Sequence, residues 1–352
     1  LKLEKEEKDD VLYYHITASA DGKEIYEEEN AGGTVKVSVP YNATFNGVTP
    51  SVYYVKDSTT KELVDSTYEN GTLTWSTAHF STYQVEDNAI ASITTGEETT
   101  YYPTIQEAID AAANGQTVAL AKDSSIKEIK IESSKAVTLD LNGKTLTTTA
   151  DKAIKVYGHL SIKDSSKEAT GVINATNLDI AENVIEVIGS EAVLTFESGK
   201  LTNNCAYGYG VGIIGGATAI VNGGSMECYN SPLTGNNTQG NMNITVNGGT
   251  LTAKYGPAIY MPSQGNLTIT NGTLNGGVSL RMGNVTISGG TINAATSDID
   301  SPSEYYNYSG NAWLPDALYV FGGTYKSDAG NKLTLNITGG TFNCTNKQGS
   351  AI

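Results

Sequence analysis

Ile244-Thr245-Val246-Asn247-Gly248-Gly249-Thr250-Leu251 is one copy of a phrase that recurs along this 352-residue chain. It joins an apolar, β-branched triplet to a glycine-containing turn, and the turn to Thr and an apolar residue. Other copies begin at Val137, Leu194, Leu267, Val285 and Leu335. Repetition at a spacing of a few tens of residues predicts a solenoid, in which each repeat packs on its neighbours.

The chemistry of the phrase indicates which solenoid forms. Its apolar residues alternate with polar ones, and the copies contain no run of helix-forming residues, so each copy predicts strands joined by tight turns. Glycine pairs supply the positive φ that such corners need. Asparagines recur at the same place in the turn and are expected to form an internal amide ladder; they are Asn142, Asn222, Asn247 and Asn271.

A second repeated phrase, small-apolar-variable-apolar, predicts a third strand in every rung, as in Ala258-Ile259-Tyr260-Met261. Period-two alternation points the apolar pair inward and the variable residue outward. The predicted outer column is Lys155, Glu186, Ile214, Thr234, Tyr260, Arg281 and Tyr319. On the inner side, Leu194, Ile244, Leu267 and Val285 are expected to stack in one apolar column.

The fold class predicted is all-β: a right-handed parallel β-helix of about eight rungs within residues 89–352, following a small β-sandwich at 1–88. The handedness follows from the rule for parallel crossover connections. Residues 104–113 predict a short capping helix, because Pro103 precedes a capping box of Thr104 and Glu107 and Asn114-Gly115 ends it. An Asn70-Gly71 hairpin turn and alternating segments indicate the sandwich.

Charge and composition narrow the partners. The chain has 38 acidic and 22 basic side chains and a formal net charge of -16 at pH 7, which argues against nucleic acid or an anionic membrane surface. Residues 201–352 hold 5 basic and 6 acidic groups, which leaves 17 and 32 for residues 1–200. The later rungs are therefore suited to neutral ligands. No segment has the apolar length of a membrane span, so no membrane insertion is expected.

The three cysteines and the last residues raise two further expectations. Cys205 and Cys228 fall in neighbouring rungs and are close enough to form a disulfide, whereas Cys344 is too distant; three buried, inert thiols are the preferred alternative. Residues 349–352 restart the small-apolar phrase, so further rungs or domains are expected beyond residue 352.

Two regions of the chain resemble a known group of proteins. Tyr102-Pro103-Thr104-Ile105-Gln106-Glu107-Ala108-Ile109, Gly115–Leu120 and Val137–Lys144 are similar to the opening of pectin-lyase-like β-helices in surface proteins of Gram-positive gut bacteria. Val52–Val55 and Thr77–Tyr83 resemble the end of a β-sandwich module of the same multi-domain proteins. The resemblance implies an extracellular location on the bacterial cell surface, and it covers lyases, hydrolases, adhesins and inert stalks alike.

An enzyme of this fold needs clustered charged groups. Pectate lyases use acidic residues for Ca²⁺ and a basic residue as proton acceptor, and hydrolases use two or three neighbouring carboxylates. The predicted outer column offers one carboxylate, Glu186, and one arginine, Arg281, several rungs apart; Arg281 is the only arginine of the chain. A polysaccharide lyase or hydrolase is therefore kept as an alternative, with no catalytic residue assigned.

Aromatic residues favour a binding function. Connections between strands carry Tyr207, Tyr209, Tyr229 and Tyr255, and the longest connection, 294–316, carries Tyr305, Tyr306, Tyr308 and Trp313. Together with Tyr260, Arg281 and Tyr319 they predict an aromatic face that binds an extracellular glycan or a host matrix protein, as an adhesin does. The plain alternative is that these rings only hold their own loops in place.

Two further expectations concern metal binding and a purely structural role. Asp298, Asp300 and Glu304 of the long connection are a candidate Ca²⁺ site, although their spacing lacks the pattern of an EF-hand loop. No other metal or cofactor is expected. The chain is also suited to a structural stalk, which spaces other domains from a cell wall and needs no binding site.

Overall fold

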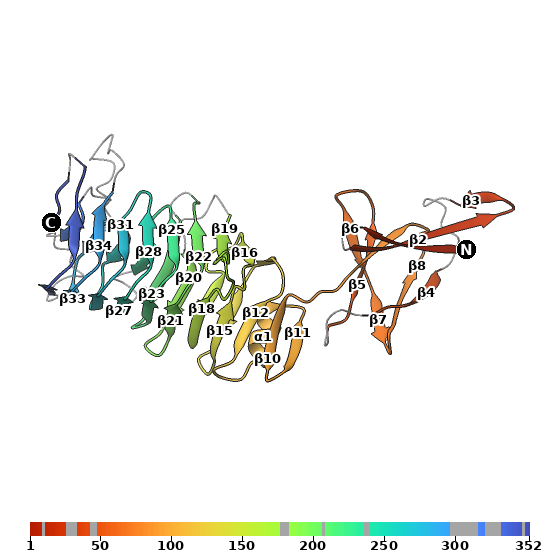
Figure 1. Cartoon of the computed structure of the whole chain (residues 1–352), viewed down its shortest axis with the longest axis horizontal. Helices are drawn as coiled ribbons and strands as arrows, with labels where there is room; N and C mark the ends of the chain where they lie inside the picture. The colour runs from red at the N-terminus through yellow and green to blue at the C-terminus, as the bar shows by residue number, and fades with distance from the viewer. Residues whose placement is uncertain are drawn as a thin grey trace. The chain divides into compact units, whose positions relative to one another are not determined.

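The computed structural model shows an all-β chain with one short helix (Figure 1). It describes residues 1–8, 11–25, 34–42, 48–176, 183–205, 208–235, 240–295, 316–320, 332–346 and 349–352. The chain divides into two compact units, Leu1–Thr104 and Ile105–Ile352. The sequence-based division at residue 88 lies earlier in the chain, before a hairpin at residues 91–102 that belongs to the first unit.

The first unit consists of antiparallel strands. They are β1 (Lys2–Lys8), β2 (Val11–Ala20), β3 (Lys23–Ile25), β4 (Val35–Pro40), β5 (Ser51–Val55), β6 (Lys61–Val64), β7 (Ser66–Glu69), β8 (Thr72–Thr77), β9 (Thr82–Glu86), β10 (Ala91–Thr95) and β11 (Glu98–Tyr102). One sheet has the order β1-β2-β9-β5-β6, with β3 also paired to β2, and another has the order β4-β8-β7. Strands β10 and β11 form an antiparallel hairpin.

Both of these sheets contribute to one buried core. Trp75 of β8 and Tyr83 of β9 are almost fully buried, and their ring centroids lie 5.7 Å apart. The predicted hairpin turn at Asn70-Gly71 is confirmed: both residues have positive φ, and Glu69 pairs with Thr72. Alternation of buried and exposed residues along β4 and β8 produces the shared core.

The second unit begins with helix α1 (Ile105–Ala111) and continues as short strands distributed over three sheets. The first sheet contains β12 (Thr117–Leu120), β15 (Ala136–Asp140), β18 (His159–Lys163), β21 (Val193–Phe196), β24 (Thr218–Val221), β27 (Met242–Val246), β30 (Gly265–Ile269), β33 (Gly283–Ile287) and β36 (Leu333–Ile337). The second contains β13 (Ser124–Ile126), β16 (Thr145–Thr148), β19 (Val172–Ala175), β22 (Lys200–Asn203), β25 (Ser225–Cys228), β28 (Thr250–Ala253), β31 (Thr273–Gly276), β34 (Thr291–Ala294) and β37 (Thr341–Asn343). The third contains β14 (Ile129–Ile131), β17 (Ile154–Val156), β20 (Asn183–Ile188), β23 (Tyr209–Ile214), β26 (Leu233–Gly235), β29 (Ile259–Met261), β32 (Val278–Leu280) and β35 (Leu318–Val320).

Each successive group of three strands enters the first, second and third sheets in turn, and we call such a group a coil. Within the second unit, neighbouring strands of each sheet pair in parallel, for example β12 with β15, β13 with β16 and β14 with β17. Figure 1 shows the coils following one another along a single axis from α1 to β36 and β37. The parallel sheets are confirmed, and their winding is compatible with the predicted β-helix.

Apolar side chains form inner columns, because the coils pair in register. Leu194, Ile244, Leu267 and Val285 lie in one column, as predicted, with Ala219 between the first two. Each of these side chains is almost completely buried. A strand pattern that alternates in the sequence therefore becomes a continuous core along the solenoid axis.

Helix α1 covers the first coil, which confirms the predicted cap. Ile105, Ala108 and Ile109 are buried, and the helix packs against β12 and β14. The Gln106 side chain accepts a hydrogen bond from the amide of Lys130 and donates one to its carbonyl, at 2.8 and 3.1 Å. This amide takes the place of a neighbouring strand at the edge of the third sheet, where unpaired backbone groups would otherwise invite another chain.

The turns require glycine because successive coils approach closely. A Cβ on Gly249 would lie 2.8 and 2.9 Å from the carbonyl oxygens of Gly223 and Gly224 in the coil below. At the other end of the described chain, the amides of Ala317 and Leu318 donate to the carbonyls of Ser350 and Ala351. Ser350 and Ala351 therefore lie beside the start of β35.

Candidate functional site

The outward column of the third sheet differs from the predicted one at two positions. Backbone pairing aligns Glu186 with Gly212 and Tyr260 with Ser279, so Gly212 replaces Ile214 and Ser279 replaces Arg281. The observed column is Lys155, Glu186, Gly212, Thr234, Tyr260, Ser279 and Tyr319. A shift of two residues preserves the alternation of faces, and the sequence pattern therefore cannot distinguish the two registers.

This face of the third sheet is covered at its later coils. Thr234, Tyr260 and Ser279 point outward from their strands and yet are only 7%, 6% and 3% exposed. Arg281 follows β32, and its amide donates to the carbonyl of Met261. Tyr260 therefore does not present its ring as part of an open aromatic surface.

Several predicted site residues lie outside the described part of the chain. They are Tyr207, Tyr305, Tyr306, Tyr308 and Trp313 of the aromatic prediction, and Asp298, Asp300 and Glu304 of the calcium prediction. Tyr260 and Tyr319 lie in the same column of the third sheet, but they are two coils apart and Ser279 lies between them. The predicted aromatic face is thus not assembled from the described residues.

The second sheet has an open surface over its later coils. A hollow of about 920 Å³ extends along the ends of its later strands. Five successive coils, those of β25, β28, β31, β34 and β37, contribute residues that pair with one another from strand to strand. Phe342, Lys254 and the segments that follow the strands complete the walls. We call this hollow the second-sheet groove; charged side chains among its lining residues are only Glu227 and Lys254.

A ladder of neutral polar side chains forms the floor of this groove. Asn343 Nδ2 donates to Asn293 Oδ1 at 2.9 Å, and Asn293 Nδ2 donates to Asn275 Oδ1 at 2.8 Å. Asn275 Nδ2 in turn donates to Thr252 Oγ1 at 3.1 Å. Each amide uses one donor and at most one acceptor site in the ladder, so a second N–H and further lone pairs remain for a ligand.

Glu227 occupies the next place in the column, and its charge is already partnered. Lys200 Nζ of the preceding coil lies 2.8 Å from Glu227 Oε2. Beyond this pair the floor of the groove is uncharged. An ionic ligand therefore meets little compensating charge along Thr252, Asn275, Asn293 and Asn343, whereas a neutral ligand with hydroxyl or amide groups finds hydrogen-bonding partners.

Two tyrosines stand beside the groove, in the turn that leaves the second sheet. The ring centroids of Tyr229 and Tyr255 are 4.6 Å apart, and both rings are partly exposed. Lys254 Nζ lies 5.0 Å from the centroid of the Tyr255 ring, a cation–π contact that connects the pair to the groove wall. Both tyrosines were among the candidate ligand residues of the sequence, and the structure brings these two together.

The groove floor itself was missed by the sequence analysis. A signal was present: each copy of Thr-apolar after the turn is followed by Thr or Asn, as in Leu251-Thr252, Leu274-Asn275, Ile292-Asn293 and Phe342-Asn343. Period-two alternation places these residues outward, in one column. Small neutral side chains carry no aromatic or charged signal, and for that reason the sequence-based predictions did not include them.

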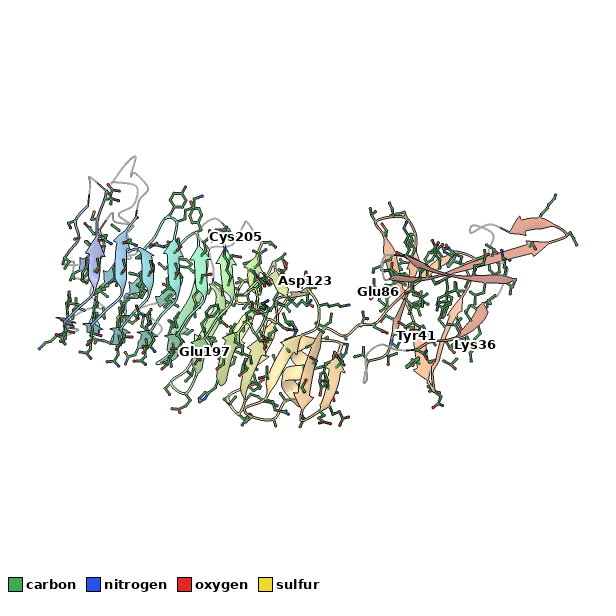
Figure 2. The ribbon with its side chains drawn as sticks, in the orientation of Figure 1. Lys36, Tyr41, Glu86, Asp123, Glu197 and Cys205 are labelled. Carbon is green, nitrogen blue, oxygen red and sulfur yellow. The ribbon has the colours of Figure 1, made fainter. Side chains whose placement is uncertain are left out.

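The predicted turn ladder forms with different members. Asn222 donates to the carboxylate of Glu197 at 3.0 Å, Asn247 to Asn222 at 3.0 Å, and Thr270 to Asn247 at 2.9 Å. Figure 2 shows Glu197 at one edge of the solenoid and Cys205 at the opposite edge. Asn142 instead donates to the carbonyl of Leu120, and Thr270 takes the ladder position expected for Asn271. The ladder is exposed rather than internal.

Two buried carboxylates of the early coils hold turns together. Asp140 accepts hydrogen bonds from the amides of Asn142 and Ser165, both at 2.9 Å. Asp164 accepts from the amides of Gly171, Ser166 and Gly143. Burial acts to raise the pKa of Asp164, but these amides together hold the pKa below its ordinary value. Asp164 therefore stays ionised as an acceptor for its turn and is a poor proton donor.

The cysteines form no disulfide. Cys205 and Cys228 are buried and Cys344 is half-buried. Burial raises the pKa of both Cys205 and Cys228, which keeps these thiols protonated and poorly reactive. The alternative of unbonded, inert thiols is therefore confirmed for these two, and the disulfide alternative is wrong in this structure.

The described residues contain no group of three or more His, Cys, Asp or Glu side chains that could hold a metal ion. Among them, no helix has the length and apolar character required to cross a bilayer. Comparisons of the chain with protein-family models, with curated proteins and with solved structures found no significant match. The geometry of the chain itself must therefore support any functional assignment.

Proposed function

We propose that this chain is a non-catalytic binding protein of the bacterial cell surface and that it holds a neutral glycan in the second-sheet groove. The observation that carries the proposal is the uncharged ladder Thr252–Asn275–Asn293–Asn343 along the groove floor. Amide and hydroxyl groups in a concave site are the partners that sugar hydroxyls require.

The ladder also defines the direction of the ligand. Its members come from successive coils, and neighbouring strands of a sheet are about 4.8 Å apart. A linear glycan that follows the solenoid axis meets one amide or hydroxyl group per coil. The partly exposed pair Tyr229 and Tyr255 then supplies a flat apolar surface for a sugar ring beside the groove.

The assignment of family and architecture belongs to the same proposal. We propose a right-handed parallel β-helix of the pectin-lyase-like type, preceded by a β-sandwich module, in an extracellular adhesin-like protein. The three parallel sheets of the second unit and the shared core of two antiparallel sheets in the first support it. The remaining sequence-based predictions, a host matrix ligand, a Ca²⁺ site at 298–304 and the loop aromatics, stay predictions.

Binding is preferred to lyase or hydrolase chemistry because four carboxylates of the described solenoid already have structural partners. Asp140 and Asp164 accept backbone hydrogen bonds, Glu227 pairs with Lys200, and Glu186 lies 3.9 Å from Lys152. A glycosidase of the usual kind needs two carboxyl groups facing one sugar linkage.

A glycan array, printed beside host matrix proteins, tests the proposal with the full chain. Asn275→Ala combined with Asn293→Ala should lower the signal for neutral glycans about tenfold, equivalent to one or two net hydrogen bonds. Thr147→Ala, in the same outward column but three coils before Glu227, where this column enters the groove, is the matched control. Binding that survives the double variant, or binding to matrix proteins alone, would contradict the proposed site.

A further inference from the structure

The outer face of the first sheet carries a second regular array of neutral side chains over its last four coils. Register and hydrogen bonds align three columns, which cross β27, β30, β33 and β36 and the turns after them. Row by row, the members are Asn243, Thr245, Asn247; Asn266, Thr268, Thr270; Asn284, Thr286, Ser288; and Thr334, Asn336, Thr338. We call these twelve residues the first-sheet array, and all twelve are exposed or partly exposed.

The absence of charge in this array is confined to the later coils. The same three columns in the earlier coils include Asp140, His159, Lys163 and Glu197. All members of the array are Asn, Thr or Ser, although first-sheet positions elsewhere accept charges without loss of the fold. Neutrality is therefore a property of this part of the surface and is not imposed by the strand geometry.

Hydrogen bonds and the packed core behind it make the array rigid. Asn266 Nδ2 donates to Asn243 Oδ1 at 2.9 Å, and Thr270 Oγ1 donates to Asn247 Oδ1 at 2.9 Å. Between the outward residues, Ile244, Leu267 and Val285 are almost completely buried. The polar groups are thus held at fixed positions before any ligand arrives, which lowers the entropy lost on binding.

The spacing of the array repeats in two directions. Coils are about 4.8 Å apart along the axis, and alternate residues of one strand are about 6.7 Å apart across it. A ligand that contacts all three columns at once must itself be periodic in two directions. A single soluble glycan follows one column, whereas the face of an ordered polymer, with chains packed side by side, can meet several.

We propose that the first-sheet array binds the ordered surface of a neutral, insoluble polysaccharide. The match is one of charge and chemistry: twelve uncharged hydrogen-bonding side chains face a polymer whose surface offers only hydroxyl or amide groups. This surface is distinct from the second-sheet groove, and the inference does not rest on a glycan being bound there.

The test measures retention of the full chain by microcrystalline cellulose and by chitin. Thr245→Lys, Thr268→Lys and Thr286→Lys together place three charges in the middle column and should reduce retention by about tenfold or more, the equivalent of one or two net hydrogen bonds. Thr138→Lys, Ser161→Lys and Thr195→Lys change the same column in earlier coils and should leave retention unchanged. Thermal unfolding must show that both triple variants are folded. If one is not, the single variant Thr268→Lys and its control, the single variant Ser161→Lys, replace them.

Three results would overturn the inference. The first is that neither polymer retains the unsubstituted chain, and the second is that both triple variants lose retention equally. The third is that neither polymer retains the chain while sedimentation shows a dimer, and that only the substitutions at Thr245, Thr268 and Thr286 dissociate this dimer. That result would assign the face to a second copy of the chain. Soluble cellohexaose and chitohexaose, assayed with the Asn275 and Asn293 variant, report on the groove separately, so failure of one proposal is distinguishable from failure of the other.

Discussion

Asn293 lies between two other asparagines, donating to Asn275 Oδ1 at 2.8 Å and accepting from Asn343 Nδ2 at 2.9 Å. Its side chain is thus a donor to one coil and an acceptor from the next. Because all three amides point the same way, the ladder has a direction, and one change of donor to acceptor interrupts it.

Asn293→Asp should therefore destabilise the later coils. The aspartate can still accept from Asn343, but it faces Asn275 Oδ1 with a carboxylate oxygen and no donor. We expect a loss of about 1 kcal/mol in the free energy of unfolding at pH 7, smaller at pH 3, where the carboxyl group is protonated and donates again. Denaturant unfolding at the two pH values measures it; an equal loss at both would show that the ladder direction is unimportant.

Leu267→Ala should cost about 2 to 4 kcal/mol in the free energy of unfolding, through lost transfer energy and the cavity left behind. Leu267 is completely buried between Ile244 and Val285 in the inner column. Thr268→Ala, its outward neighbour, is the control and should change stability little. Comparable losses for the two variants in denaturant titrations would contradict the assignment of inner and outer faces.

Gln106→Ala should open the first coil. The variant loses both hydrogen bonds to Lys130 and exposes the edge of β14, at an expected cost of about 1 to 2 kcal/mol. Hydrogen exchange of the Lys130 amide should accelerate, whereas exchange in β27 to β36 should not. Lys127→Ala, on the exposed turn between β13 and β14, serves as control. Unchanged exchange at Lys130 would mean that the side-chain amide does not protect the edge.

Asp164→Asn should destabilise the protein at neutral pH and lose this effect in acid. The folded-state pKa of Asp164 lies below its ordinary value, so the ionised carboxylate contributes stability above the unfolded pKa, and the contribution disappears as pH falls through the folded pKa. The difference from the unsubstituted chain should be about 1 kcal/mol at pH 7 and narrow below about pH 4. Unfolding midpoints of both proteins, measured from about pH 2 to about pH 7, test the direction of this change. A stability difference between the two proteins that widens in acid would refute the prediction.

Thiol labelling of the native protein should distinguish the cysteines. Cys228 is buried and its pKa is raised by burial, whereas Cys344 is half-buried at the groove. A thiol reagent should therefore modify Cys344 first and Cys228 only on unfolding. The variant Cys344→Ser should remove the fast phase; a fast phase that remains would place the accessible thiol elsewhere.

Local sequence determined the strands, their inward and outward faces and the capping helix. Alternation in Ile244-Thr245-Val246 and the glycines after it act over a few residues, and a period of two leaves only one way to bury the apolar face. The inward orientation of Leu194, Ile244, Leu267 and Val285 followed for the same reason.

Tertiary structure decided the rest, because coil-to-coil pairing is not a local property. Ser279 rather than Arg281 aligns with Tyr260, since a shift by two residues keeps every side chain on its face and only the backbone hydrogen bonds between coils select the register. Burial of Tyr260 and the groove over Asn275 and Asn293 likewise depend on which surfaces the stacked coils leave uncovered. Sequence alone identified the residues that point outward, and the packing of neighbouring coils determined which of their side chains a ligand can reach.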